Sequence, residues 1–356
     1  MGGSRADRRT GNEANHPMKK PGPIAGRVDP PTASGPDWGE RLRLRLPYPL
    51  GSPFVWAWSR RWLLCVYFAS TSVVWLASAV GKIPIGFDAR IYVRAAAAWL
   101  QGADPWAAST SNGTYVWHFA ALPTALFPMA SFALMPENLA VALWLLLSLA
   151  AAVYVVRVLS LPSWWLLFPP LVVGVWSANP GVLLLALLVS GRSWAGAFAT
   201  LLKVYAGIPL LGMRAWRAIG LTAVATAVTI AIAPATWWSY VSRFGMISAR
   251  ITSESHGGAS AWVYPPLVPL TAAALGLVWW LDRPRFWWVA VPALWPAAEI
   301  HWSVLVLPVM TPTLAVLLAP IVPGLPAVAT VVYAGQLLYR QTRVDYISAP
   351  GVRSMP

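Results

Sequence analysis

The sequence of 356 residues contains few charged side chains, few acids and a single cysteine. Charged residues make up 11% of the chain and hydrophobic residues 58%, whereas soluble proteins carry about 25% charged residues. So little polar surface excludes an ordinary soluble globule of this length. Because Cys65 has no second cysteine to pair with, the chain cannot form an intramolecular disulfide or a thiolate metal cluster.

Common motifs of soluble enzymes are missing as well. The sequence has no glycine loop that would bind nucleotide phosphates, no HExxH zinc motif and no nucleophile elbow. These absences argue against soluble, nucleotide-dependent catalysis. We also expect no cleaved signal peptide, since the first apolar run begins near residue 60 and many others follow it.

The sequence has instead a series of long apolar runs, and a helix needs about 20 such residues to cross a bilayer. The runs are continuously apolar rather than alternating, which favours helices over the strands of a membrane barrel. We therefore predict an all-α, polytopic integral membrane protein with about 10–12 transmembrane helices. Tryptophans near the run ends, among them Trp62, Trp238 and Trp302, are expected at the headgroup level. The predicted spans are residues 62–80, 116–135, 138–157, 163–178, 180–191, 194–212, 216–235, 263–281, 286–299, 302–320 and 322–339.

The net charge of +14 is distributed unevenly along the chain. Through Arg61 the sequence has 11 basic and five acidic residues. Rich in proline, glycine and arginine, residues 1–60 are predicted to form a disordered tail, which the positive-inside rule places in the cytoplasm. Because the tail lacks interleaved aromatic residues, we expect anionic membrane lipids as its partner and no nucleic acid.

The rest of the chain divides into a membrane domain, residues 61–340, and a C-terminal tail, residues 341–356. Alternating the spans from a cytoplasmic N-terminus gives two extracytoplasmic loops, at residues 81–115 and 236–262. Within the first loop, residues 88–101 are predicted to form an interfacial helix. The expected location is the plasma membrane, crossed many times.

Acidic residues that could act as a base are scarce in the membrane domain. Outside the tail the sequence has seven: Asp88, Asp104, Glu137, Glu254, Asp282, Glu299 and Asp345. The topology places four of them at the outer face: Asp88, Asp104, Glu254 and Glu299. Asp88 follows the first span, where a shielded carboxylate could deprotonate a hydroxyl. Its alternative role is a helix N-cap, which aspartate favours.

Lys203 lies near the middle of an apolar run, LLKVYAGIPLL. A cation there costs about 2.5–3.5 kcal/mol on insertion scales unless it faces a polar cavity or a partner. Snorkelling is the alternative, but Trp194 and Gly212, at the two ends of the run, are each nine residues away. We therefore predict that Lys203 binds an anionic headgroup such as a lipid phosphate.

Other polar residues at the outer face could assist Asp88 and Lys203. His301 follows Glu299 where two apolar runs meet, and it could bond a phosphate or a hydroxyl; a satisfied interfacial histidine is the alternative. Arg250 and His256 belong to the second outer loop, which is either a substrate lid or a solvated connection. Asn112-Gly113-Thr114 matches a glycosylation sequon.

Three stretches carry a family resemblance. The first, FDARIYVRAAAAWLQGADPW, has an aspartate after the first span, then a tyrosine, an alanine-rich helix and a Gly-x-Asp-Pro-aromatic turn. The others are AGAFATLLKVYAGIPLLGMRAWRAI and HWSVLVLP. Over residues 60–320, the chain resembles the polyprenyl-phosphate-sugar-dependent glycosyltransferases of family 87 (DUF2029), which have the GT-C architecture.

The resemblance implies inverting transfer of a hexose, most often mannose, from a polyprenyl phosphate to a lipid-linked or glycan acceptor at the extracytoplasmic face. Asp88 would be the general base. Binding of the donor phosphate would fall to Lys203, His301, Arg250 and His256, and the substrate pocket would contain Tyr92, Asp104, His118, Asn179 and Glu299. Because a lipid phosphate leaves without a diphosphate to neutralise, no metal and no other cofactor is predicted.

Two alternatives stay open at this point. The family's Tyr-Pro-Pro is replaced by Trp117-His118-Phe119, its Gly-Gln-x-Asn by Ser177-Ala178-Asn179-Pro180, and its late double histidine is single. These departures favour a non-catalytic member of the family. The other alternative is a transporter or flippase of lipid-linked intermediates, which predicts inverted repeats with broken helices around a midplane site.

Overall fold

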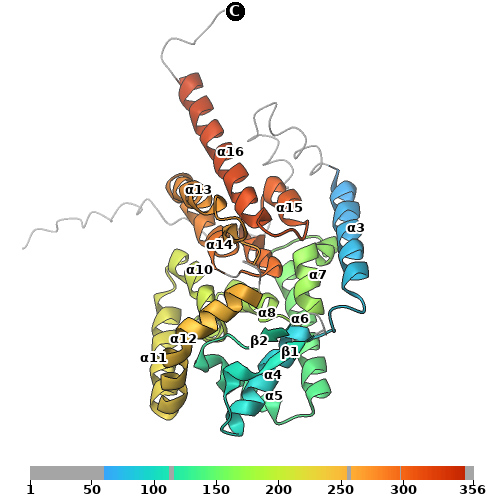
Figure 1. Cartoon of the computed structure of the whole chain (residues 1–356). Helices are drawn as coiled ribbons and strands as arrows, with labels where there is room; N and C mark the ends of the chain where they lie inside the picture. Colours follow the sequence, from blue (N-terminus) through green and yellow to red (C-terminus); the bar gives the residue numbers. More distant parts are fainter. Residues whose placement is uncertain (1–59, 112–115, 255–257, 297, 349–356) are drawn as a thin grey trace, which may run out of the picture. The chain divides into compact units, whose positions relative to one another are not determined.

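The chain is described by a computed structural model over residues 60–111, 116–254, 258–296 and 298–348 (Figure 1). Outside these ranges lie most of the predicted tails, the sequon and one predicted site residue: residues 1–59 and 349–356, Asn112-Gly113-Thr114 and His256. The predicted all-α class is confirmed, since the described part is predominantly helical. Its regular structure includes one antiparallel pair of short strands.

Many of the helices are short. The α-helices are α3 (Arg61–Ala79), α4 (Phe87–Leu100), α5 (Leu126–Ala133), α6 (Glu137–Val158), α7 (Pro169–Trp176), α8 (Pro180–Val189), α9 (Ser193–Leu202), α10 (Gly207–Gly212), α11 (Trp216–Ile232), α12 (Pro234–Glu254), α13 (Leu267–Leu281), α14 (Arg283–Leu294), α15 (Pro312–Leu318) and α16 (Leu325–Ser348). The 3₁₀ helices are η1 (Pro105–Ala107), η2 (Pro123–Ala125), η3 (Ser163–Leu167), η4 (Val204–Ala206), η5 (Ala261–Val263) and η6 (Ile300–Val309). The strands are β1 (Ser109–Ser111) and β2 (Val116–His118).

Two of the described helices, α3 and α6, are long and apolar enough to cross a membrane. Two pairs pass the same test only if each is one bent span: α7 with α8, bent by 117°, and α11 with α12, bent by 104°. The described residues thus contain two to four such helices, fewer than the predicted 10–12. The other apolar runs are present but divided into shorter segments.

These runs are divided where a polar residue or a proline interrupts the helix. The predicted span 194–212 is two helices, α9 and α10, because Lys203 between them is extended (φ −148°, ψ 117°). The predicted span 302–320 is the 3₁₀ helix η6, which contains Pro308, followed by α15. Proline lacks the N–H that a helix interior needs. The prediction of one continuous helix is therefore wrong for both runs.

The predicted first outer loop contains the helix that carries Asp88. The helix expected at residues 88–101 is α4, and η1 and the β1–β2 hairpin follow it. Strand β2 occupies the start of the predicted span 116–135, so that span is also wrong. The predicted second outer loop, residues 236–262, is mostly the 21-residue helix α12 rather than a flexible connection.

Aromatic side chains pack the core at both ends of α7. Phe68 of α3 is fully buried, and its ring centroid lies 5.3 Å from that of Trp165 and 5.2 Å from that of Phe168. Trp144 of α6 donates its indole N–H to the carbonyl of Ala178 at 2.8 Å. This bond satisfies a carbonyl that the end of α7 leaves without a helical partner.

Gly86 joins the start of α4 to the end of α7. Its N–H donates to the carbonyl of Trp176 at 2.9 Å, and the N–H of Asp88 donates to the carbonyl of Ser177 at 2.9 Å. The backbone of Gly86 is left-handed (φ +73°), and a Cβ there would overlap the side chain of Val141 on α6. The glycine thus permits the close approach that holds Asp88 beside the break after α7.

We expect Gly86→Ala to destabilise the protein more than Gly102→Ala does. Both glycines have φ +73°, so each substitution carries a left-handed strain of about 1–2 kcal/mol. Only the new Cβ at position 86 meets Val141, and such overpacking adds about 1–3 kcal/mol. Thermal unfolding in detergent checks this. Equal midpoints for the two variants, or no rescue of Gly86→Ala by Val141→Ala, would contradict the packing described.

Candidate functional site

Interruptions of the helices bring polar residues together. They occur at the start of α4, at the break between α7 and α8, at the end of α9 and just before η6. At such points a helix leaves backbone groups free for capping and turns its side chains away from the apolar stripe. The residues placed there, which we call the polar cluster, are Asp88, Asn179, Lys203, Glu299 and His301.

Asn179 connects the two carboxylates of the polar cluster. As the N-cap of α8, its side-chain oxygen accepts the N–H of Gly181 at 2.8 Å. The other end of the amide is then directed away from α8, and Nδ2 donates to Oδ2 of Asp88 at 2.8 Å and to Oε2 of Glu299 at 3.4 Å. A local capping bond therefore orients the Asp88 carboxylate.

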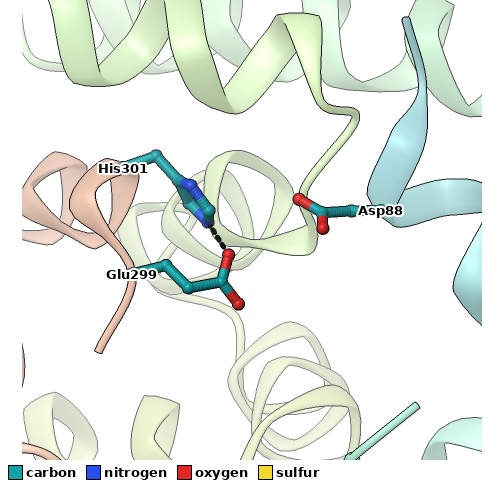
Figure 2. A group of neighbouring side chains, drawn as sticks. All are labelled: Asp88, Glu299 and His301. Carbon is teal, nitrogen blue, oxygen red and sulfur yellow. Dashed lines mark ion pairs between the residues drawn. The ribbon is translucent and has the colours of Figure 1, made fainter. Parts of the chain in front are cut away.

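Glu299 and His301 face Asp88 from a different part of the chain (Figure 2). Nε2 of His301 lies 3.1 Å from Oε2 of Glu299. One donor atom from each of the three residues lies within 4.8 Å of the other two, a spacing that could hold a metal ion. The His301 side chain is 7% exposed and that of Glu299 is 40% exposed.

Lys203 supplies the positive charge of the polar cluster. Its ammonium lies 5.5 Å from the ring centroid of Tyr92 and 5.9 Å from that of Trp302. It interacts electrostatically with Asp88 and Glu299. Because these carboxylates compensate the cation within the apolar core, Lys203 has no need to extend toward either end of its apolar run.

Two buried polar atoms next to the polar cluster have no hydrogen-bond partner within the described part of the chain. They are the hydroxyl of Tyr205 and the indole N–H of Trp302. A buried group left unpaired costs about 1–3 kcal/mol. Such groups are rare, and two of them side by side indicate a position where water, an ion or a substrate binds.

The electrostatic environment of Asp88 alters its acidity. Burial raises the pKa of the Asp88 carboxyl to about 6, and the negative charge of Glu299 adds to the increase. The imidazole of His301 and the hydrogen bond from Asn179 act in the opposite direction. A carboxyl with a pKa near 6 is ionised at neutral pH and accepts a proton more readily than an ordinary aspartate.

Three other predicted site residues form a separate group on α12 and the first outer loop. Asp104 forms an ion pair with Arg243. His118 pairs with Glu254 through its side chain and also donates its backbone N–H to the carboxylate at 2.9 Å. Arg250 donates to a backbone carbonyl of η1 at 2.9 Å. Of the four acids predicted at the outer face, Asp88 and Glu299 belong to the polar cluster, whereas Asp104 and Glu254 form separate ion pairs. These pairs join α12 to the segment that contains η1 and the β1–β2 hairpin.

Sequence reasoning missed three residues next to the polar cluster: Ser177, Tyr205 and Trp302. Trp302 was expected at the headgroup level. Its side chain is 4% exposed, and its ring is tilted against that of Tyr205 with centroids 4.0 Å apart, so it packs inside the protein rather than facing its surroundings. An aromatic residue at the end of an apolar run has the same sequence signal whether it lies at the membrane surface or in the protein core.

No protein-family model matches the chain, and no curated protein and no solved structure matches it either. The resemblance to family 87 therefore stays a prediction from short motifs. The role of the polar cluster has to be argued from its own chemistry.

Proposed function

We propose that the protein is a membrane glycosyltransferase. It transfers a hexose, with mannose as the expected sugar, from a polyprenyl-phosphate donor to a hydroxyl of a lipid-linked or glycan acceptor at the extracytoplasmic face of the plasma membrane. The observation that carries the proposal is the electrostatic interaction between the Asp88 carboxylate and the Lys203 ammonium, both of which lie among apolar helices. Proton abstraction next to a departing anion needs both charges.

Exposed apolar faces support a membrane location. Large apolar side chains are exposed along α6 and α11, among them Leu139, Leu146, Leu147, Leu149, Leu221, Val224, Val228, Ile230 and Ile232. On α3, only 22% of the apolar window is buried. Soluble monomers rarely expose apolar surface of this extent. Lipid tails would cover these faces, and a lipid-linked donor could then approach the polar cluster from the bilayer.

Asp88 is the general base of the proposed reaction. Its carboxylate takes the proton of the acceptor hydroxyl while the hydroxyl oxygen attacks the anomeric carbon. The bond from that carbon to the phosphate oxygen breaks at the same time, so in-line attack inverts the anomeric configuration. Asn179 holds Oδ2 of Asp88 through its amide, and the hydroxyl meets the other carboxylate oxygen.

Lys203 stabilises the departing lipid phosphate, whose negative charge grows in the transition state. The Trp302 ring lies under the Lys203 ammonium. Its indole N–H has no partner within the described residues, so this N–H is available to donate to a phosphate oxygen. The hydroxyl of Tyr205, which also has no partner within the described residues, is a further donor for the same anion.

A transporter of lipid-linked intermediates is a second candidate, because the polar cluster lies at broken helices. α9 ends at Lys203, and the α7–α8 pair bends by 117° around Asn179. Broken helices around a polar site are typical of transporters. We prefer the enzyme because a carboxylate such as Asp88 can take the proton of an acceptor hydroxyl. In a carrier the same carboxylate would only repel the phosphate of the substrate.

Incubation of the purified protein with a panel of polyprenyl-phosphate sugars and extracted envelope lipids tests the proposal. We expect a lipid product heavier by one hexose in mass spectrometry, with an inverted anomeric centre in NMR spectra. If no product forms, and vesicles that contain the protein move the lipid-linked sugar across their membrane, the protein is the transporter instead.

A further inference from the structure

We propose that the polar cluster binds a divalent transition-metal ion through Asp88, Glu299 and His301 (Figure 2). The sequence predicts no metal, so the inference adds a ligand to the proposed function. The donors are one oxygen of each carboxylate and Nε2 of the imidazole. At Asp88 the ion would share the oxygen that Asn179 holds, because a carboxylate oxygen has two lone pairs, and the other oxygen stays free for the acceptor hydroxyl. This mixed set suits Mn²⁺, Fe²⁺ or Zn²⁺, whereas Mg²⁺ and Ca²⁺ prefer oxygen ligands alone.

Distances between the donor atoms fit a single ion. Two ligands about 2.1 Å from a metal and at right angles to each other are about 3.0 Å apart. Nε2 of His301 and Oε2 of Glu299 are 3.1 Å apart. All three donors lie within 4.8 Å of one another. Ligands of one ion are about 3.0 Å apart at right angles and about 4.2 Å apart on opposite sides, so the distances to Asp88 would have to shorten by at most about 1.8 Å.

Unpaired groups around the three donors point to a ligand independently. Tyr205 is 2% exposed and Trp302 is 4% exposed, and the Tyr205 hydroxyl and the Trp302 indole N–H have no hydrogen-bond partner within the described residues. Tyr205 interacts electrostatically with Asp88 and Glu299. Water molecules on the ion would provide the missing partners.

The charges of the polar cluster also favour a dication. With His301 neutral, the carboxylates of Asp88 and Glu299 outweigh the ammonium of Lys203 by one negative charge, which repels an anionic donor. A divalent ion reverses the sign, so a donor phosphate would enter a positive site. This argument alone rests on the proposed function, while the geometry and the unpaired groups stand without it.

Titration of the purified full-length protein with Mn²⁺, followed by the EPR signal of the free ion, tests the site without any substrate. We expect saturable binding, weakened at least about tenfold in Glu299→Gln and in His301→Gln. His118→Gln is the matched control, because His118 pairs with Glu254 instead, and it should bind Mn²⁺ like the wild type. Circular dichroism of each variant separates a folding defect from a lost ligand.

Two outcomes would overturn the metal site: no binding of Mn²⁺ or Zn²⁺ to the folded wild type, or equal binding by the wild type and Glu299→Gln. The transfer assay separates this failure from that of the proposed function. Binding of Mn²⁺ without sugar transfer would uphold the metal site and remove the glycosyltransferase. Transfer in EDTA by a protein that binds no ion would remove the metal site and leave the enzyme.

Discussion

Asp88→Asn should reduce sugar transfer by about 10²- to 10⁴-fold and leave the protein folded. Asparagine keeps the size of the side chain and an oxygen that can accept from Asn179, but it cannot take a proton from the acceptor hydroxyl. The backbone N–H at position 88 still donates to the carbonyl of Ser177, so α4 stays in place. Initial rates of product formation, measured by mass spectrometry, give the fold change.

Glu137→Gln is the matched control for removing a carboxylate. Glu137 pairs with Arg90 at 2.6 Å and with Arg94 at 2.9 Å, and its side chain is 33% exposed. Partly exposed pairs of this kind contribute roughly 1 kcal/mol or less, so transfer should continue near the wild-type rate. If the wild type and Asp88→Asn transfer sugar equally fast, Asp88 is not the base. If neither has activity, the chain is a scaffold, a non-catalytic family member or the transporter.

Lys203→Met should lower kcat/KM for the lipid-phosphate donor by about 10²- to 10³-fold, the usual loss when one donor to a developing negative charge is removed. Methionine retains most of the apolar stem that packs near the rings of Tyr92 and Trp302, so the substitution removes mainly the charge. The charge on the phosphate increases toward the transition state, and kcat should therefore fall together with donor affinity. Initial rates at varied donor concentration measure both.

Lys82→Met provides the comparison for Lys203→Met, because these are the two lysines among the described residues. Lys82 is exposed just after α3, and its replacement should leave kcat/KM unchanged. If Lys203→Met also transfers sugar at the wild-type rate, the ammonium merely balances the carboxylates of Asp88 and Glu299.

Local signals were enough to place two of the site residues. The helix predicted at residues 88–101 differs from α4 by one residue at each end, because glycine flanks an alanine-rich run on both sides. Asn179 followed by Pro180 marks a helix start, with asparagine as the N-cap and proline in the first turn. The boundary between two predicted spans accordingly falls at the break between α7 and α8.

The interruption at Lys203 could not be predicted locally. Its neighbours are apolar residues that suit a helix, and the lysine itself has good helix propensity. The backbone of Lys203 is extended, and its ammonium interacts electrostatically with Asp88 and Glu299, which come from distant parts of the chain. Apolar content likewise does not distinguish one long helix from two short ones that turn back, so the sequence did not show which of the predicted spans are continuous helices.

Ion pairs between residues that are far apart in the sequence could not be predicted either. His118 and Glu254 are 136 positions apart, and Asp104 and Arg243 are 139 positions apart. A single sequence does not reveal such partners. The resemblance placed Asp104 and His118 in the substrate pocket, whereas their observed partners join the first outer loop to α12.

Equilibrium binding of a polyprenyl-phosphate-mannose donor to the wild type, Asp88→Asn and Lys203→Met tests most directly whether the two charges serve one site. A chelator in the buffer ensures that only the charges of the chain act on the phosphate. Opposite shifts are expected, because loss of the Asp88 charge relieves repulsion and tightens binding, whereas loss of the Lys203 charge weakens it. Wild-type affinity in both variants would contradict a shared site for Asp88 and Lys203.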